Sequence, residues 1–571
     1  MPHIELPFPD TQWSDASHGA GCSTCSAIAP ELREKFDEFP HVKRYLHTMP
    51  IEELGVPKFA EKLDRAMGAD DQPNYIYPVG NSVFAHVLFD AKDARNWYVP
   101  IEPVILSNYD ELMAIVEELL VDAVHKFTQP ASNDEQREVL LHALDKVISV
   151  KSQGSLAPSD GWQKPKASKR ISIGQIDLDA IRYLLLRDKV GLGILDGMIL
   201  DPNIEDVSCA GLGPVFIEHK VFKALKSTVI FDRHDDLDAF LRRTSERIKK
   251  PVTYRKPIVD ATLPDGSRVN IVYGAEVSKR GSNFTIRKFT ATPLSVMDVI
   301  NGGACTYQMI AYLSIMIEEG MNLWVSGETA SGKTTLLNAL TTFYSGDSKI
   351  VTVEDTPEVQ VPHPNWIREV VRGAAGEASS VTMFDLLKAA LRQRPNAIII
   401  GEIRGEEGNI AFQAMQTGHA VMATFHAATV EKLIQRVTAA PILVPKSYMD
   451  NLNLVVIASA VKLPNGKLGR RVMSINELFG YDSVTDSFSF AEVFHWDPIT
   501  DVHEFTGYMN SYLLENKVAP ARGIPPNQRR RIYQEIDRRA KVLEKLHTGS
   551  NITDFYELYK VLGNAKKQGL F

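Results

Sequence analysis

The stretch Gly327-Glu-Thr-Ala-Ser-Gly-Lys-Thr334 decides the fold of this chain, because it has the form G-x-x-x-x-G-K-[ST]. Glycines at both ends of such a loop let the backbone turn tightly, so that successive N–H groups face one anion. A helix that begins at the lysine adds further N–H donors and the positive end of its dipole. The residues predicted to bind phosphate are Gly327, Glu328, Thr329, Ala330, Ser331, Gly332, Lys333, Thr334 and Thr335.

The residues on either side of this loop predict a nucleotide-binding fold. Asn322–Ser326 is a short apolar run that predicts a buried strand, and Lys333–Leu340 has the pattern of a helix. In this setting the Lys333 amine reaches the β- and γ-phosphates, and the Thr334 hydroxyl coordinates Mg²⁺. We therefore expect ATP and Mg²⁺ as cofactors.

Apolar runs alternate with helical patterns beyond the loop. Strands are expected at Lys349–Glu354, Ala397–Gly401 and Ala420–Thr424, with helices at Met383–Leu391 and Asn409–Gln416 between them. Strands that alternate with helices predict a parallel sheet covered on both faces. The C-terminal part is therefore expected to be an α/β domain.

The 571 residues are too many for one hydrophobic core, which rarely exceeds about 300 residues. Helices are expected at Asn108–Phe127, Asp134–Val150, Ile176–Lys189 and Asp235–Lys249, and the last two are followed by short strand-like runs. This mixture predicts a compact α+β domain ahead of the α/β domain. We expect three regions, which are 1–105 of unknown role, 106–290 as the α+β domain, and 295–571 as the ATPase domain with C-terminal helices.

Charge and hydropathy limit the classes of function. The formal net charge of −8 gives no overall attraction to nucleic acid. No segment approaches the ~20 apolar residues of a membrane-spanning helix, and the N-terminus lacks the basic and apolar regions of a secretory signal. The expected location is the cytoplasm, and a cytoplasmic protein can still act at the membrane surface.

The four cysteines do not predict a disulfide framework in a chain of this size. Cys209 and Cys305 lie among apolar residues and are expected to be buried. Cys22 and Cys25 form a Cys-x-x-Cys with His18 four residues earlier, but tetrahedral zinc takes four ligands, or three with an open position. Because no second Cys/His pair follows, we expect a thiol pair in a mobile N-terminal segment rather than a metal site.

Acidic and histidine side chains follow the predicted strands. Glu402 ends the strand that begins at Ala397, which is where a carboxylate that holds Mg²⁺ belongs. Glu354 and Asp355 end another strand, and we expect one of them to polarise water. His419 and His426 bracket a short strand, and the residues alone favour a structural role for both.

Three further segments resemble the type II/type IV secretion ATPases, the hexameric motors of general secretion, pilus assembly, conjugation and the archaellum. The segments are the acidic box Val353-Glu-Asp-Thr-Pro-Glu358, the Walker B variant Ile400-Gly-Glu-Ile-Arg404, and the histidine box Thr417-Gly-His-Ala-Val-Met-Ala-Thr-Phe-His426. The resemblance covers the chain from about Ile171 to the C-terminus. It implies a RecA-like ATPase domain preceded by the smaller α+β domain.

The resemblance also implies roles for single residues. Glu354 corresponds to the catalytic glutamate that acts as general base, and Glu402 to the Walker B glutamate that supports Mg²⁺. His419 and His426 correspond to the histidine box, which couples the γ-phosphate to domain movement. This implied role replaces the structural role that the residues alone favour. Together with Lys333, these four make up the expected catalytic set.

Arginines of this family also contact the nucleotide, because a guanidinium neutralises charge that develops on the phosphoryl group. Arg268 and Arg287 resemble two N-domain arginines of the family, and we expect both to contact phosphate. Arg392, Arg394 and Arg404 are weaker candidates, which we expect in ion pairs or subunit contacts.

The resemblance is closest to archaeal members, and no four-cysteine zinc module follows the histidine box. It implies a cytoplasmic homohexamer at the inner face of the membrane that powers assembly of an archaellum, a type IV pilus or a secretion pseudopilus. The implied partners are a polytopic membrane platform protein and anionic lipid, without nucleic acid. One alternative is a conjugative DNA-transfer motor, which the basic cluster Arg529–Arg531 would favour. The other is a nucleotide-dependent scaffold that does not hydrolyse ATP.

Overall fold

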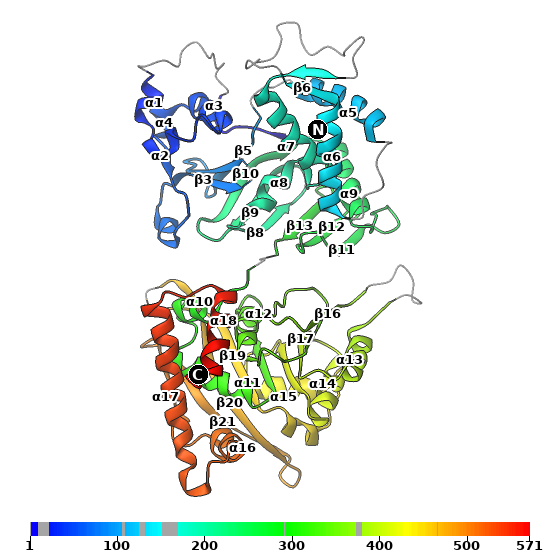
Figure 1. Ribbon diagram of the computed structural model, residues 1–571. Coiled ribbons are helices and arrows are strands. Elements are labelled where there is room, and N and C mark those ends of the chain that lie inside the picture. The colour runs from blue at the N-terminus through cyan, green and yellow to red at the C-terminus, as the bar shows by residue number, and fades with distance from the viewer. Residues whose placement is uncertain are drawn as a thin grey trace. The chain divides into compact units, whose positions relative to one another are not determined.

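The computed structural model shows two compact units, Met1–Phe289 and Thr290–Phe571, which are described separately here (Figure 1). The residues that the structure describes are 2–9, 22–80, 82–104, 109–124, 132–150, 170–289, 292–372, 380–464 and 466–571.

A nine-stranded sheet organises the second unit. Its strand order is β16-β15-β17-β18-β14-β19-β20-β21-β22. The first six of these strands are parallel, and the last three continue the sheet in antiparallel pairing. The bounds are β14 Leu323–Gly327, β15 Ile350–Glu354, β16 Trp366–Val370, β17 Ala397–Ile403, β18 Ala420–Phe425, β19 Leu454–Lys462, β20 Leu468–Asp482, β21 Ser487–Asp497 and β22 Val502–Glu504.

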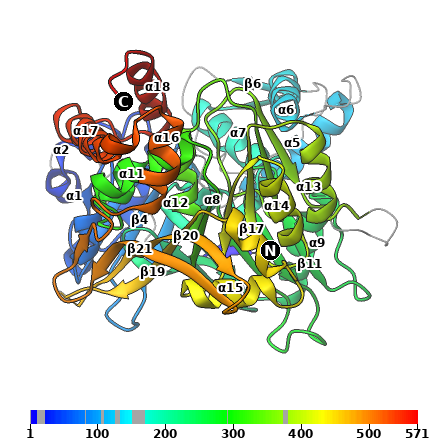
Figure 2. The ribbon, with the colours of Figure 1, turned by 90° about the horizontal axis from the view of Figure 1, so that it is seen from below.

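Helices cover both faces of this sheet, as expected for parallel strands. Side chains of β14 alternate between two cores, with Leu323 and Val325 in one and Trp324 in the other. Figure 2 shows α11 and α17 on the left of the sheet, and α13 and α14 on its right. The bounds are α10 Val296–Asn301, α11 Tyr307–Glu318, α12 Lys333–Leu340, α13 Met383–Arg392, α14 Glu407–Gln416, α15 Val430–Thr438, α16 Ala519–Ala521, α17 Ile532–Glu544 and α18 Phe555–Lys567.

An eleven-stranded sheet forms the centre of the first unit, with the order β11-β12-β13-β8-β9-β10-β5-β4-β3-β2 and with β1 paired to β10. The strand bounds are β1 His3–Ile4, β2 Lys58–Phe59, β3 Asn74–Gly80, β4 Val83–Leu88, β5 Asn96–Ile101, β8 Ile204–Cys209, β9 Gly213–His219, β10 Lys223–Phe231, β11 Ile258–Thr262, β12 Arg268–Val272 and β13 Asn283–Arg287. The helix bounds are α1 Ser23–Ala27, α2 Pro30–Arg33, α3 Pro40–Thr48, α4 Ile51–Leu54, α5 Tyr109–Val124, α6 Asn133–Val147, α7 Gln175–Lys189, α8 Asp196–Leu200 and α9 His234–Arg247.

The first hundred residues belong to this same sheet. Strand β5 pairs in parallel with β10, so the chain before and after residue 105 forms one unit. The structure therefore places the division of the chain near residue 290 and shows none at the expected boundary of 105. Long-range pairing of this kind leaves no mark in local composition, because each strand is short and its partner lies more than a hundred residues away.

One predicted helix ends earlier than expected. Asp134–Val150 is helical only as far as Val147, after which β6, Ile148–Val150, pairs with β7, Ile171–Ile173. The β-branched Ile148 and Val150 favour the extended conformation once a partner strand is present.

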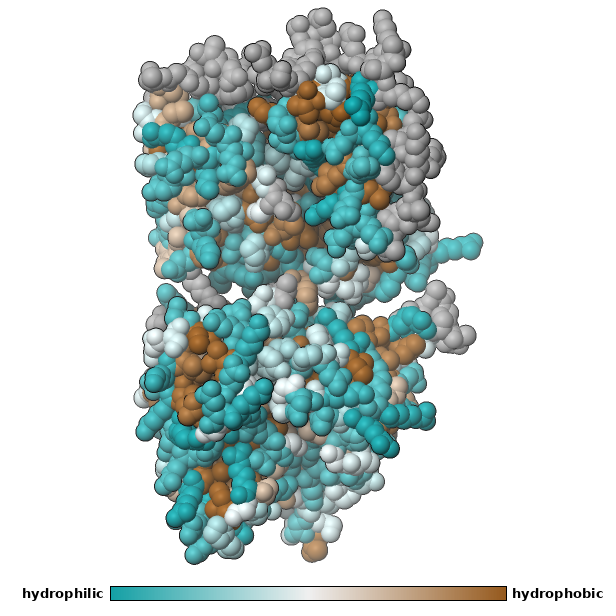
Figure 3. All heavy atoms as spheres, viewed as in Figure 1, coloured by the Kyte–Doolittle hydropathy of each residue, from teal (hydrophilic) through white to brown (hydrophobic). Residues whose placement is uncertain are grey.

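One face of the molecule is drawn by hydropathy in Figure 3. On the face drawn in Figure 3, hydrophilic residues prevail and hydrophobic residues form separate smaller groups. No helix among the described residues has both the length and the apolar character needed to cross a membrane.

Candidate active site

The predicted phosphate loop connects a buried strand to a helix. Every residue of β14 is buried, and α12 begins at Lys333 with Gly332 as its N-cap. Gly332 has φ of +89°, a left-handed conformation that side chains disfavour. At Gly327, a Cβ atom would collide with the carbonyl oxygen of Ala458 and lie 2.7 Å from the Ser331 Oγ. Both glycines are therefore required by the backbone path.

The loop has the donors that a nucleotide phosphate requires. Lys333 is buried, and its Nζ donates a hydrogen bond to the Glu328 carbonyl oxygen at 2.8 Å. Burial lowers the pKa of Lys333, while the carboxylates of Glu402 and Glu358 act in the opposite direction. The buried Ser331 Oγ has no hydrogen-bond partner within the described ranges. A phosphate oxygen in the loop would supply partners for both side chains, so these residues fit a nucleotide.

Glu402 and His426 meet beside the loop. The His426 Nε2 lies 2.9 Å from the Glu402 Oε1, and Arg404 donates to the Glu402 Oε2 at 2.6 Å. Burial lowers the pKa of His426, and the positive charges of Lys333 and Arg404 add to that effect, while Glu402 opposes it. The net effect is a pKa of His426 below its ordinary value. The same electrostatic interactions show that Lys333, Glu402 and His426 form one cluster.

Strand register brings this cluster together. β14 pairs in parallel with β18, with Ser326 opposite Phe425, so the phosphate loop and His426 leave the sheet at the same edge. The Ser326 hydroxyl donates to the Ala427 carbonyl oxygen at 2.7 Å and accepts from the Ala427 N–H at 3.1 Å. This pair of hydrogen bonds holds the segment that carries His426. We call the ends of β14, β15, β17 and β18 on this side the carboxyl edge.

Glu354 also lies at the carboxyl edge, but its carboxylate is already engaged. It is fully buried, and its Oε1 accepts from the N–H groups of Glu358 at 2.7 Å and Val359 at 2.6 Å. The Arg368 Nε lies 3.5 Å from its Oε2. Burial raises the pKa of Glu354 to about 7, against these stabilising contacts. The side chain therefore exchanges a proton near neutral pH and also holds the turn after β15.

A cavity of about 520 Å³ opens beside the loop. Its walls come from the start of the loop, from the segment after β18 and from α15. The lining residues are Gly327, Glu328, Thr329, His426, Ala427, Ala428, Lys432, Gln435 and Arg436. The cavity is thus continuous with the phosphate loop, has basic side chains in its wall and is large enough for part of a nucleotide.

Two arginines at this site were not predicted from the sequence. The Arg470 Nε donates to the Ala330 carbonyl oxygen at 3.1 Å, and its side chain lies over Gly332. Arg436 donates to the His426 carbonyl oxygen and packs against the Phe425 ring. Arg436 could have been suspected from its place ten residues after His426, whereas Arg470 has no local signal.

The remaining candidates lie elsewhere. His419 precedes β18 at the opposite end from His426, and its Nδ1 lies 3.0 Å from the Thr417 hydroxyl. In the first unit, Arg268 and Arg287 are direct neighbours on β12 and β13, and Arg268 binds both carboxylate oxygens of Asp260. Arg287 is exposed.

The three weaker arginine candidates, Arg392, Arg394 and Arg404, differ in their position and partners. Arg404 forms ion pairs with Glu402 and Asp355, as expected from the sequence. Arg392 ends α13, and Arg394 follows it with φ of +51°.

Comparisons with known proteins show the family of this chain. Residues 189–462 match the family model described as type II/IV secretion system protein. The uncharacterized protein MJ0900 of Methanocaldococcus jannaschii is 41% identical over 544 residues, which cover 95% of this chain and 97% of that protein. The type IV secretion system protein PtlH of Bordetella pertussis is 30% identical over 231 residues, 36% of this chain and 67% of that protein.

Among solved structures, the pilus retraction motor PilT with bound ADP is 18% identical and covers 49% of this chain and 80% of its own, with a TM-score of 0.36. The family model spans the phosphate loop and the strands that carry Glu402 and His426, and the M. jannaschii match extends over nearly the whole chain. The chain therefore belongs to the type II/IV secretion system protein family.

Proposed function

We propose that this protein is an ATPase that binds and hydrolyses Mg-ATP at the carboxyl edge of the second unit. The observation that carries the proposal is the cluster of Lys333, Glu402 and His426 beside a phosphate loop of correct form. Parallel α/β sheets bind ligands at the carboxyl ends of their strands, where helix N-termini and loops converge. The membership in a family that includes secretion ATPases supports the same conclusion.

Each side chain has a distinct task in this proposal. The loop N–H groups and Lys333 hold the phosphates, and Lys333 exchanges the Glu328 carbonyl oxygen for a phosphate oxygen. Thr334 and Glu402 would hold Mg²⁺, which would supply positive charge to neutralise the transferred phosphoryl group. His426 fixes the orientation of Glu402 through their 2.9 Å contact.

Glu354 is the proposed general base. Its pKa of about 7 suits proton abstraction from water near neutral pH. Release of one of the two backbone N–H contacts on its Oε1 would free that oxygen for the attacking water. The assignment of Arg268 and Arg287 as phosphate contacts, and of His419 to the histidine box, rests on the family resemblance alone.

The proposed work of this ATPase is assembly of a surface filament, which includes an archaellum, a type IV pilus or a secretion pseudopilus. We propose a homohexamer at the inner face of the cell membrane that acts on a polytopic membrane protein. The names of the relatives, a type IV secretion system protein and a pilus retraction motor, support this class of function.

The C-terminal basic residues have different surroundings. Glu535 accepts hydrogen bonds from both Arg538 and Arg539, and Arg539 is buried against Glu318. In the cluster Arg529–Arg531, Arg529 donates to the Asn516 Oδ1 at 2.9 Å, whereas Arg530 and Arg531 are exposed, so a direct test with DNA is needed to decide the DNA-transfer alternative.

The decisive experiment measures phosphate release from ATP by the full chain and by Glu402→Gln. The variant is expected to lose on the order of 10²-fold in rate while still binding ATP, because the loop and Lys333 are intact. The matched control is Glu557→Gln, an exposed carboxylate on α18 that should leave the rate unchanged. Equal rates for Glu402→Gln and the wild type would refute the proposed hydrolytic site.

A second measurement separates the two motor types. The ATPase rate of the wild type is measured alone, in the presence of vesicles that contain anionic lipid, and in the presence of double-stranded DNA. Stimulation by the vesicles is expected. Stimulation by DNA alone would favour the DNA-transfer alternative over filament assembly.

A further inference from the structure

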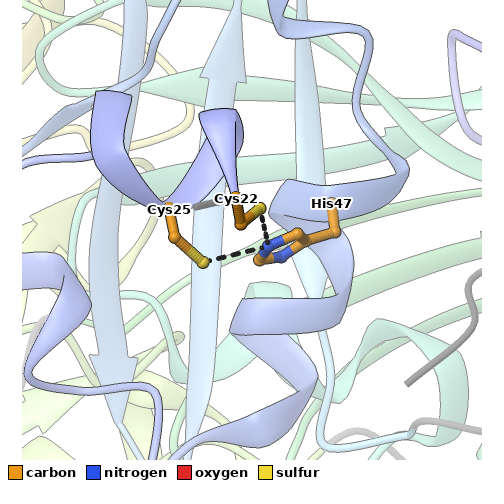
Figure 4. A group of neighbouring side chains, drawn as sticks. All are labelled: Cys22, Cys25 and His47. Carbon is orange, nitrogen blue, oxygen red and sulfur yellow. Dashed lines mark hydrogen bonds between the residues drawn. The ribbon is translucent and has the colours of Figure 1, made fainter. Parts of the chain in front are cut away.

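Three side chains with metal-binding atoms converge in the first unit, far along the sequence from the ATPase motifs. Cys25 lies in α1, Cys22 is the N-cap residue directly before that helix, and His47 comes from the last turn of α3 (Figure 4). The His47 Nε2 lies 3.5 Å from the Cys22 Sγ and 3.2 Å from the Cys25 Sγ. The three atoms all lie within 4.8 Å of one another, and the cysteines form no disulfide.

These distances match the ligand spacing of tetrahedral zinc. With Zn–S bonds of about 2.3 Å and a Zn–N bond of about 2.0 Å, tetrahedral geometry separates sulfur from nitrogen by about 3.5 Å. The observed 3.5 and 3.2 Å differ from that value by a few tenths of an ångström at most. The side chains are thus already placed for an ion to enter with little movement.

The imidazole is also held in the orientation that a ligand needs. The His47 Nδ1 lies 2.6 Å from the Lys43 carbonyl oxygen, which can only accept a hydrogen bond. The proton therefore resides on Nδ1, and Nε2 directs its lone pair toward the two sulfurs. A backbone carbonyl in this position is the usual outer partner of a metal-bound histidine. The Phe36 ring, in edge contact with His47, restricts the ring further.

We propose that Cys22, Cys25 and His47 bind one zinc ion. Two thiolates neutralise the charge of Zn²⁺, and the Cys₂His donor set is one that zinc favours. Within the described part of the chain the cluster contains these three donors and no fourth His, Cys, Asp or Glu. His18, the neighbour considered from the sequence, lies outside the described residues.

The ion fastens the N-terminal helices to the sheet. Helix α1 has five residues and no side-chain cap, so it has little stability of its own. Cys25 packs at the rim of a core that joins Ile28 and Leu32 to Val42, Leu46 and the inner face of β3–β5. A zinc bridge from α1 to His47 would add a link between α1 and α3 at the edge of that core. The role of the ion is thus structural, within the first unit.

The test is the metal content of the full chain, purified without a chelator or a metal-affinity tag. About one zinc per chain is expected by elemental analysis. Replacement by cobalt is expected to produce a thiolate-to-cobalt charge-transfer band and the visible bands of a tetrahedral site. A metal-free protein that takes up no cobalt in this form, or a mass lower by two hydrogens from a Cys22–Cys25 disulfide, would overturn the proposal.

Variants assign the ligands. Cys25→Ser and His47→Ala are each expected to reduce zinc from about one to near zero per chain, while Cys209→Ser, a buried thiol elsewhere in the unit, retains it. Zinc retained at full occupancy by His47→Ala would contradict the three-ligand site. If the variants do not fold, the wild type is treated with a thiol-modifying reagent. Release of zinc when the Cys22 and Cys25 thiols are modified would identify these thiols as ligands. ATP hydrolysis serves as the independent check, because loss of zinc and loss of the ATPase site are separate outcomes.

Discussion

The two ends of strand β18 carry the same residue type in different surroundings. At the carboxyl end, His426 lies 2.9 Å from Glu402 and within electrostatic reach of Lys333. At the amino end, His419 contacts the Thr417 hydroxyl. A strand of this length separates the two by roughly 20 Å. The direction of the strand, and not the residue type, decides which histidine lies beside Glu402 and Lys333.

The same rule explains the rest of the carboxyl edge. β14, β15, β17 and β18 are parallel, so the loops that leave them all begin on one side of the sheet. Lys333, Glu354 and Glu402 lie on that side. The predictions below test whether function is confined to it.

Removal of the Lys333 amine should have the largest effect. Lys333→Ala is expected to lower ATP hydrolysis by on the order of 10³-fold and to weaken nucleotide binding, because no other side chain of the loop carries positive charge to the phosphates. Phosphate release and equilibrium binding of a fluorescent ATP analogue measure the two effects. Lys567→Ala, an exposed lysine on α18, is the control, and comparable losses in both variants would contradict the assignment.

Glu354 should give the second largest effect, on stability as well as on the rate that its proposed role as general base implies. Its pKa is raised from 4.5 to about 7 by burial, so the unfolded chain releases this proton at lower pH than the folded protein. Stability from this group is therefore present below about pH 4.5 and falls, by up to about 3 kcal/mol, as pH rises toward 7. Glu354→Gln removes that dependence.

The measurement is the difference in melting temperature between the wild type and Glu354→Gln at pH 5 and at pH 7.5. The melting temperature of Glu354→Gln should rise relative to that of the wild type at the higher pH. A difference that does not change with pH would show that Glu354 ionises normally. Glu557→Gln again provides the exposed control.

The two histidines give the direct test of strand direction. His426→Ala is expected to lower the hydrolysis rate by roughly ten- to a hundredfold, because Glu402 loses its orienting contact. His419→Ala should change the rate by less than about twofold in the isolated chain, since its contact is with Thr417 at the other edge. Equal losses would mean that the carboxyl edge is not the whole of the site.

Arg470 should give the smallest effect. Its hydrogen bond to the Ala330 carbonyl oxygen holds the loop from β20, and loss of one such bond costs about 1 kcal/mol. Arg470→Ala is therefore expected to raise the dissociation constant for ATP about fivefold. Arg531→Ala, on the exposed C-terminal segment, is the comparison, and an unchanged affinity in Arg470→Ala would remove that residue from the site.

Local patterns explain what the sequence predicted. The phosphate loop, β14, α12, β15, β17 and β18 all depend on short-range glycine placement and apolar periodicity, and their predicted bounds agree with the structure to within a few residues. The pairing of these strands also places Glu402 near Lys333, as the order of motifs indicates.

Long-range contacts explain the features that were not predicted from the sequence. Arg470 lies 140 residues from Ala330, and the two meet only because β20 pairs with β19 beside the loop. His47 lies 22 residues beyond Cys25, and two short helices must fold on the β3–β5 strands before the three donors meet. The sequence prediction grouped His426 with His419 through the family resemblance, although a parallel sheet already implies that only His426, which follows β18, lies at the edge of the phosphate loop.

The most direct test of the central claim is a crystal structure of the full chain with Mg²⁺ and a non-hydrolysable ATP analogue. The predicted result places the β-phosphate against the loop N–H groups, with the Lys333 Nζ on a phosphate oxygen and the metal near Thr334 and Glu402. An analogue bound away from the carboxyl edge, with the Lys333 Nζ still on the Glu328 carbonyl oxygen, would contradict the claim.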